Sequence, residues 1–267
     1  TVSAEGPSQT YTVARRAELG GGAQSIAVAF DGRGRLIVQT RSPARLAFPL
    51  LGRFIALDAT TYEDTGHRIF HAATNSSFAC ASCHPEGGDD GRTWNILGFG
   101  LRRTPSLRGG ITDTAPFHWD GDMRDFNHLA TEVFGQRMGG GVLNSSHTRA
   151  IERWVSGLPL IAPGAPDDPG AVARGAALFN DPAVGCAGCH SGAKFTNNQT
   201  VDVGTGGAFQ VPPLTGLRFR APYLHHGAAP TLRERFTLQG GGGDSHGHTS
   251  HLPRAALDDL VAYLDTL

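Results

Sequence analysis

All four cysteines of the chain fall into two copies of one short motif. They stand as Cys80-Ala81-Ser82-Cys83-His84 and Cys186-Ala187-Gly188-Cys189-His190. Two thiols three positions apart can each add to one vinyl group of a haem, and the histidine that follows can ligate the iron. The spacing therefore predicts two covalently attached c-type haems, with the cysteines as attachment sites and His84 and His190 as proximal ligands.

Other uses of these cysteines are two disulfides, a redox-active pair, or one zinc site with four thiolate ligands. A zinc site does not need a histidine after each pair, and a thioredoxin-like pair is expected once, near a βαβ pattern. Because haem c is attached outside the cytoplasm, the haem interpretation predicts a periplasmic or extracellular protein whose export signal lies outside the given sequence.

The ligand on the other side of the first iron is predicted to be Met138. It stands in a glycine-rich segment, Met138-Gly139-Gly140-Gly141, where the backbone can approach a porphyrin closely. His118 is the next candidate, and Met123, His128 or a vacant position are the remaining ones.

For the second iron the chain offers no methionine beyond Met138, but it has three histidines on a glycine-rich loop at 240–251. His246 is the first candidate, followed by His251 and His248. His225 and His226 are weaker candidates, and the loop could instead be solvated or hold a surface metal. A methionine opposite a histidine raises a haem potential, so a His/Met haem paired with a His/His haem would form a downhill path for electrons.

The elements that must position these residues repeat along the chain. A short helix is predicted before each motif, at Gly66–Phe70 and Gly175–Phe179, and Ala115–Gly121 matches Ala221–Gly227. Each half ends in a helix with an apolar stripe at i, i+3, i+4 and i+7, which reads as a core face packing on the helix before its own haem. The two stripes are Ile151, Trp154, Val155 and Leu158, and Leu257, Leu260, Val261 and Leu264. His67, His71 and His147 are interpreted as surface or capping residues.

Residues 157–170 carry four prolines and predict a linker between the halves. The expected fold is mainly α, with cytochrome c-like domains at 58–160 and 166–267 and a β segment at 1–57. In that segment two strands, 25–30 and 35–40, flank Asp31-Gly32-Arg33-Gly34 and predict a hairpin. Its sequence resembles a propeller blade, so it either packs on the haem domains or is the remnant of a larger β domain.

Composition limits the partners. The chain has 267 residues, 39% of them hydrophobic, and a formal charge of -1. No basic tract predicts nucleic-acid binding, and no apolar stretch approaches the ~18 residues of a membrane span. The expected partners are a redox protein donor and acceptor, with a larger assembly or self-association through the N-terminal segment as a further prediction.

Over residues 60–267 the chain resembles the bacterial di-haem cytochrome c peroxidase superfamily, which includes the di-haem enzyme of methylamine utilisation. Besides the cysteine motifs, the resemblance is carried by Thr104-Pro105-Ser106-Leu107-Arg108, Trp119-Asp120-Gly121, and Ala221-Pro222-Tyr223-Leu224-His225 before Thr231-Leu232. It implies a mostly helical fold with the haems in separate domains and a tryptophan between them, which is Trp119 here. Many members hold calcium between the haems through an asparagine, but Arg103 stands at that position, so calcium through backbone carbonyls is doubtful.

The same resemblance does not extend to the peroxidase machinery. The peroxidases carry a mobile distal histidine after the first motif, and here no histidine lies between His84 and His118. Their acid-base glutamine and glutamate correspond to Leu129 and Arg137, neither of which can shuttle a proton at neutral pH, although His128 could substitute for the base if the alignment shifts by one. The favoured function is therefore transfer of single electrons. The alternatives are a peroxidase, a di-haem oxidase acting through Trp119, or a module of a larger assembly.

Overall fold

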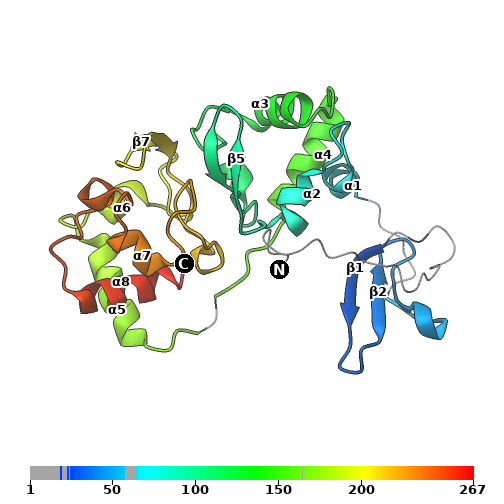
Figure 1. Cartoon of the computed structure of the whole chain (residues 1–267), viewed down its shortest axis with the longest axis horizontal. Helices are drawn as coiled ribbons and strands as arrows, with labels where there is room; N and C mark the ends of the chain where they lie inside the picture. The colour runs from blue at the N-terminus through cyan, green and yellow to red at the C-terminus, as the bar shows by residue number, and fades with distance from the viewer. Residues whose placement is uncertain (1–18, 20–22, 24, 58–63, 164) are drawn as a thin grey trace, which may run out of the picture. The chain divides into compact units, whose positions relative to one another are not determined.

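The computed structural model describes residues 19, 23, 25–57, 64–163 and 165–267. The chain falls into two compact units, Thr1–Glu63 and Asp64–Leu267, which Figure 1 traces from blue to red. The predicted boundary at residue 57 adjoins residues 58–63, which lie outside the described residues.

The first unit is a four-stranded antiparallel sheet with its strands in chain order. The strands are β1 (Ser25–Phe30), β2 (Leu36–Thr40), β3 (Arg45–Phe48) and β4 (Arg53–Ala56), with the short helix η1 (Pro49–Leu51) before the last. Strands β1 and β2 confirm the predicted hairpin, and the Asp31 carboxylate fixes its turn by accepting the backbone N–H groups of Arg33 and Arg35 at 2.9 Å. The sheet is larger than the predicted hairpin, because β3 and β4 extend it into a meander.

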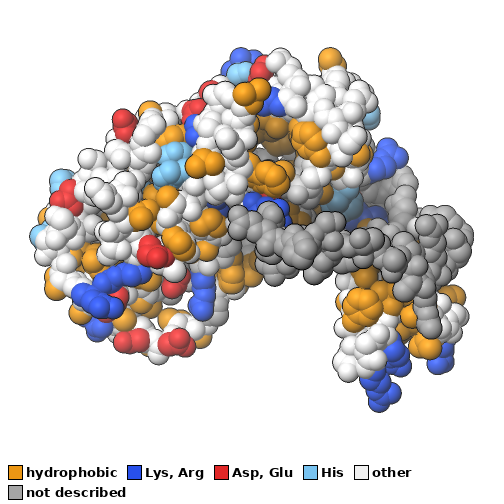
Figure 2. Space-filling model, in the orientation of Figure 1, with side chains coloured by type: hydrophobic (Ala, Val, Ile, Leu, Met, Phe, Trp, Pro, Cys, Tyr) orange, Lys and Arg blue, Asp and Glu red, His pale blue; other side chains and the backbone are white. Residues whose placement is uncertain are grey.

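This sheet exposes large apolar side chains. Val28 is 62% exposed, Phe30 70% and Phe54 62%, whereas Val38 and Ala47 are buried. Figure 2 shows such side chains in orange on the sheet. Apolar groups gathered on one surface are typical of interaction sites.

The second unit contains both cysteine motifs and repeats its elements. The first half holds α1 (Thr65–His71), α2 (Cys80–Cys83), η2 (Pro85–Gly87), β5 (Thr93–Ile96), β6 (Gly100–Arg103), η3 (Ile111–Asp113), α3 (Phe126–Leu129), the π-helix η4 (Ala130–Arg137) and α4 (Ser145–Ser156). The second half holds α5 (Pro169–Asn180), α6 (Cys186–Cys189), β7 (Thr200–Asp202), β8 (Ala208–Gln210), η5 (Leu217–Phe219), α7 (Leu232–Thr237), η6 (Gly243–His246) and α8 (Arg254–Leu264). No described residue between α4 and α5 is in a helix or strand, although the predicted linker at 157–170 overlaps the start of α5 at Pro169.

In each half the first and last helices pack against each other, α1 on α4 and α5 on α8. Both contacts need a glycine. A Cβ on Gly66 would lie 2.1 Å from the carbonyl oxygen of Ala150, and one on Gly175 would lie 2.0 Å from that of Asp259. Any larger residue would push these helices apart.

The predicted apolar stripes form the cores of the two halves. Phe70, Ile151 and Val155 make the first core, and Phe179 and Leu260 belong to the second, as the stripes predict. The N-cap of α4 is Asn144, whose side chain accepts the backbone N–H of His147.

Helices take 35% and strands 16% of the described residues, so the mainly α expectation is met only in part. The short hairpins β5–β6 and β7–β8 supply much of the difference in the second unit. None of the described helices is long and apolar enough to cross a membrane.

Candidate functional site

Each pair of cysteines occupies one turn of helix, Cys80 and Cys83 on α2 and Cys186 and Cys189 on α6. All four thiols are free, so the disulfide alternative is not met. Burial raises the pKa of Cys80 to about 11 and also raises that of Cys186, whereas a redox-active pair needs a lowered pKa. Within the described part of the chain no metal-ligand group of three includes a cysteine, so the four thiols do not form the alternative zinc site.

The histidine after each pair is oriented by one backbone carbonyl. His84 Nδ1 lies 3.3 Å from the oxygen of Gly88, and His190 Nδ1 lies 3.0 Å from that of Phe195. A carbonyl only accepts, so Nδ1–H is the donor and Nε2 carries the lone pair. Burial lowers the pKa of both histidines and favours the neutral, ligating form. Two adjacent thiols and an oriented neutral imidazole fit the donor set of a c-type haem at both motifs.

Opposite His190 lies His246. The two ring centroids are 6.4 Å apart with 32° between the ring planes. Metal–imidazole bonds are about 2.0–2.1 Å long, so this separation leaves room for one metal atom between a nitrogen of each ring. His246 Nδ1 is buried without a hydrogen-bond partner, and burial, with Arg235 and His190 nearby, lowers the pKa of His246 to about 3.

The loop that carries His246 is held in place by Asp244. Its carboxylate accepts the backbone N–H groups of Thr249 and Ser250 at 2.9 and 3.0 Å, and the Ser250 hydroxyl at 2.6 Å. The Arg235 guanidinium donates to the carbonyl of His246. His248 and His251 are exposed, so of the three loop histidines only His246 lies against a motif histidine.

Four candidates were named for the first iron, and they differ in their surroundings. His118 is engaged at both ring nitrogens, with Asp122 at 3.1 Å from Nδ1 and an Arg137 nitrogen at 3.0 Å from Nε2. Met138 is 7% exposed, follows the π-helix directly, and lies outside the apolar core of its half. Met123 is 1% exposed in a bridge with Phe117. His128, the fourth candidate, has its Nδ1 buried without a hydrogen-bond partner, whereas both nitrogens of His118 are already used.

The two halves of the second unit meet through matched backbone hydrogen bonds. Arg103 N–H donates to the carbonyl of His225 at 2.7 Å, and Gln210 N–H donates to that of Trp119 at 2.8 Å. Trp119 Nε1 donates to the carbonyl of Arg103 at 3.1 Å. Trp119 therefore lies where the halves join, tied to both of them.

An aromatic series continues from Trp119 into the second half. The Arg102 guanidinium lies 5.8 Å from the Trp119 ring and 5.1 Å from that of Phe209. Phe209 stacks on His225 with 3.7 Å between centroids, and His225 stacks on His226 at 4.3 Å. The sequence singled out Trp119 but not Arg102 or Phe209, because nothing local signals that Arg102 lies against both Trp119 and a strand of the other half.

The predicted calcium position holds the guanidinium of Arg103. It donates to the carboxylate of Asp89 at 2.8 Å, to the carbonyl of Ala221 at 2.9 Å, and to the carbonyl of Thr104. Carboxylate and carbonyl oxygens are the ligands that calcium prefers. The guanidinium of Arg103, a cation of the chain itself, thus binds oxygens of the kind that a calcium ion would take.

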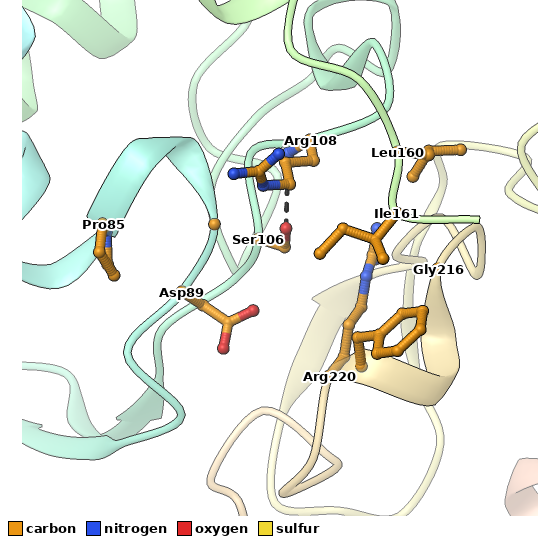
Figure 3. Close-up of a pocket in the computed structure, with 10 residues that line it drawn as sticks. Pro85, Asp89, Ser106, Arg108, Leu160, Ile161, Gly216 and Arg220 are labelled. Atoms are coloured by element: carbon orange, nitrogen blue, oxygen red, sulfur yellow. Dashed lines mark hydrogen bonds between the residues drawn. The ribbon is translucent and has the colours of Figure 1, made fainter. Parts of the chain in front are cut away.

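A cavity beside this joint is lined by both halves, with Asp89 and Arg108 on one side and Ile161 and Arg220 on the other (Figure 3). The Arg220 side chain donates to the carbonyl of Pro213 at 2.7 Å, while its second terminal nitrogen is buried without a partner. Burial lowers the pKa of Arg220 to about 10. A buried cation with a spare donor fits a carboxylate, such as a haem propionate.

Comparisons with known proteins agree with this arrangement. The Cytochrome c family profile matches residues 172–267. The chain is 29% identical to hydrazine synthase subunit gamma of Kuenenia stuttgartiensis, covering 72% of each protein, and 27% identical to methylamine utilization protein MauG of Methylorubrum extorquens, covering 84% of this chain and 81% of MauG.

Solved structures share the fold. Hydrazine synthase of Kuenenia stuttgartiensis matches with a TM-score of 0.67 and 23% identity over 80% of this chain and 98% of that one. A variant of the diheme peroxidase BthA from Burkholderia thailandensis matches with a TM-score of 0.51 and 15% identity over 92% and 94% of the two chains. The chain is thus similar in sequence and fold to members of the di-haem cytochrome c peroxidase and MauG superfamily.

This similarity supports covalently bound haem c and a role in redox chemistry. Two positions were predicted to replace the acid-base residues of the peroxidases, Leu129 and Arg137. Arg137 lies over the ring of Phe99 at 4.4 Å and contacts His118, and an arginine side chain has no acceptor atom with which to take up a proton. The aligned leucine, Leu129, ends α3.

Proposed function

We propose that this chain is a di-haem c-type cytochrome that passes single electrons between a donor and an acceptor protein. Haem c supplies a one-electron Fe(III)/Fe(II) couple when bound. The observation that carries the proposal is the pairing of His246 with His190 across 6.4 Å, because an imidazole on each side leaves no open position for a substrate.

Each half has its own attachment residues in this proposal. Cys80, Cys83 and His84 hold the first haem within a cytochrome c domain at 58–160. Cys186, Cys189 and His190 hold the second within a domain at 166–267. The repeated packing of α1 on α4 and α5 on α8 supports two such domains.

Met138 is the proposed sixth ligand of the first haem. Its support is its burial next to the π-helix η4 and the engagement of both nitrogens of His118 by Asp122 and Arg137. π-Helical turns are frequent at functional sites, where the extra residue re-aims a side chain.

Trp119 is the proposed path between the haems. Its ring lies at the joint of the two halves, where the carbonyl of Arg103 fixes its orientation. Arg102 and Phe209 continue the contact into the second half. We propose that no calcium ion is needed at this joint, because Arg103 supplies the positive charge.

An enzyme remains the second candidate, either a peroxidase or a related oxidase that acts through Trp119. One observation favours it: His128 Nδ1, beside the position of the peroxidase glutamine, is buried without a hydrogen-bond partner. A neutral imidazole there could take the proton that Leu129 and Arg137 cannot.

The proposed location is outside the cytoplasm, where haem c is attached. The exposed apolar face of the N-terminal sheet supports docking on a partner or on a second copy of the chain. A relative named as a subunit of hydrazine synthase is in keeping with a place in a larger assembly.

Low-temperature electron paramagnetic resonance of the whole protein tests the function. Fully oxidised and half-reduced samples should both give only low-spin signals if both irons carry two protein ligands. A high-spin signal on half reduction, with peroxide turnover by a reduced donor, would replace electron transfer by the peroxidase function.

A further inference from the structure

One metal-ligand cluster includes neither of the motif histidines. Among the residues that the structure describes, a single group of three side chains could hold a metal ion, and it consists of His67, His71 and Glu86. The three ligand atoms lie within 4.8 Å of one another. Two imidazoles and a carboxylate are a donor set that zinc uses in proteins, with a fourth position left for water.

Helix α1 brings the two histidines together. They are four residues apart, so they share one face of the helix, and their rings stack with 3.9 Å between centroids. His67 is 8% exposed, and both rings meet the edge of Trp154. The buried setting orients the imidazoles before any metal arrives.

His71 shows the arrangement expected of a metal ligand. Its Nδ1–H donates to the carbonyl of His67 at 2.8 Å, which directs Nε2 outwards. Metal-binding histidines are commonly fixed in this way by a carbonyl on the other nitrogen. Nε2 lies 2.9 Å from the carboxylate of Glu86, so the two atoms already converge on one point.

Glu86 is held in an uncommon backbone conformation to reach this point. Its φ is 48° and its ψ 35°, in the left-handed region that few residues other than glycine adopt. The Arg108 side chain donates to its carbonyl at 2.9 Å and anchors it. The Glu86 side chain is 58% exposed and that of His71 27%, which leaves a route for an ion from solvent.

The second half provides an internal control. Ala176 and Asn180 stand on α5 where His67 and His71 stand on α1, and Gly192 follows His190 as Glu86 follows His84. Asn180 Nδ2 donates to the carbonyl of Ala176 at 2.8 Å, in place of the bond from His71 to His67. The helix therefore does not need histidines for its own structure at these positions.

We propose that His67, His71 and Glu86 form a binding site for one zinc ion, which would lie between their three converging ligand atoms. The ion would tie η2, which follows His84, to helix α1. This inference does not depend on the electron-transfer proposal.

The test is zinc binding to the purified whole protein after treatment with a chelator and desalting. Calorimetric titration should give one zinc per chain, and metal analysis should report that zinc separately from the haem iron. The zinc X-ray absorption edge should show two imidazole nitrogens and at least one oxygen.

Two variants and a matched control locate the site. His71→Asn copies the second half and should weaken zinc binding at least about 100-fold, and Glu86→Gln at least about 10-fold. The control, His248→Asn with His251→Asn, removes the exposed loop histidines and should leave affinity unchanged. Far-ultraviolet circular dichroism and the haem absorption spectrum check that each variant is folded.

Three results would overturn the proposal. They are a parent protein that takes up no zinc, zinc binding that survives His71→Asn in a folded protein, and zinc binding that disappears in the loop control. The last result would assign zinc to the loop at 240–251 instead.

Discussion

The two motif segments are alike on one side of their histidines and different on the other. In both, the cysteines span one helical turn and the histidine that follows gives its Nδ1–H to a carbonyl four or five residues ahead. Opposite His190 stands His246, whereas the first half offers Met138 and a histidine, His118, whose nitrogens are both engaged.

The difference indicates which part of the repeat is fixed by attachment chemistry. Two thiols and an imidazole must keep one spacing, and both halves keep it. The side opposite each motif histidine would set the potential of a bound haem and the access to its iron, and there the two halves offer different residue types. The two halves also differ at corresponding positions of the joint. Arg103 of the first half corresponds to Gln210 of the second, and Trp119 corresponds to His225.

The largest effect should come from removing one attachment pair. Replacing Cys80 and Cys83 by alanine, or Cys186 and Cys189 by alanine, should each halve the covalent haem content, because each half holds its own haem. Intact mass and pyridine haemochrome absorbance measure this. A parent protein with a single covalent haem would show that the two motifs do not both attach haem.

The next effect should come from His246→Ala, which removes the imidazole opposite His190. Half of the iron should change from low-spin to high-spin in the oxidised protein, and should then bind azide or carbon monoxide. Met138→Ala should do the same to the other half of the iron. Electron paramagnetic resonance distinguishes the two variants.

His248→Ala is the control for His246→Ala, since it lies on the same loop but is exposed. Its spectrum should match that of the parent. If His246→Ala leaves every signal low-spin, then another residue occupies that side and the proposed contrast between the halves is wrong.

A third prediction concerns the joint. Arg103→Gln gives the first half the residue of the second and leaves the carboxylate of Asp89, 11% exposed, without its partner. Removing one member of a buried ion pair costs about 3–5 kcal/mol in the free energy of unfolding. Gln210→Ala removes one neutral hydrogen bond, to the carbonyl of Thr114 at 2.9 Å, and should cost about 1 kcal/mol.

Urea unfolding of the two variants measures this difference, and added calcium sharpens it. Calcium added to the zinc-free parent should not raise its free energy of unfolding, because Arg103 takes the place of a calcium ion. Equal losses in the two variants, or a parent stabilised by added calcium, would mean that Arg103 is not the cation of the joint.

Local patterns were enough to predict much of this molecule. The apolar spacing of Ile151 and Val155 predicts α4, and the Asp31 turn predicts the first hairpin, because neighbours in the sequence decide both. His246 could be named as a candidate ligand of the second iron, because few residue types can bind a haem iron and the chain has no methionine beyond Met138.

Contacts between distant segments could not be predicted in this way. His67 was interpreted as a surface residue, yet it is buried, because its exposure depends on Trp154 in a helix more than 80 residues later. The oxygens around Arg103 come from Asp89 and Ala221, and no spacing rule connects them. Strands β3 and β4 were missed since neither has a strong alternating pattern.

The smallest predicted effect is on the pH dependence of stability and concerns His225. Trp119 occupies the matched position in the first half and does not ionise. Burial lowers the pKa of His225 to about 4, with smaller contributions from His226 and Arg102. A histidine in the unfolded chain has a pKa of about 6.5. Between these values the unfolded chain binds a proton that the folded protein does not, so the free energy of unfolding falls as the pH is lowered through this window and is fully restored above it. His225→Phe keeps the stacking on Phe209 and should lose less stability between about pH 7 and pH 5 than the parent, as measured by urea unfolding. His251→Gln, an exposed control, should keep the parent's slope, and an unchanged slope in His225→Phe would show that this position titrates no differently in the folded and unfolded chain.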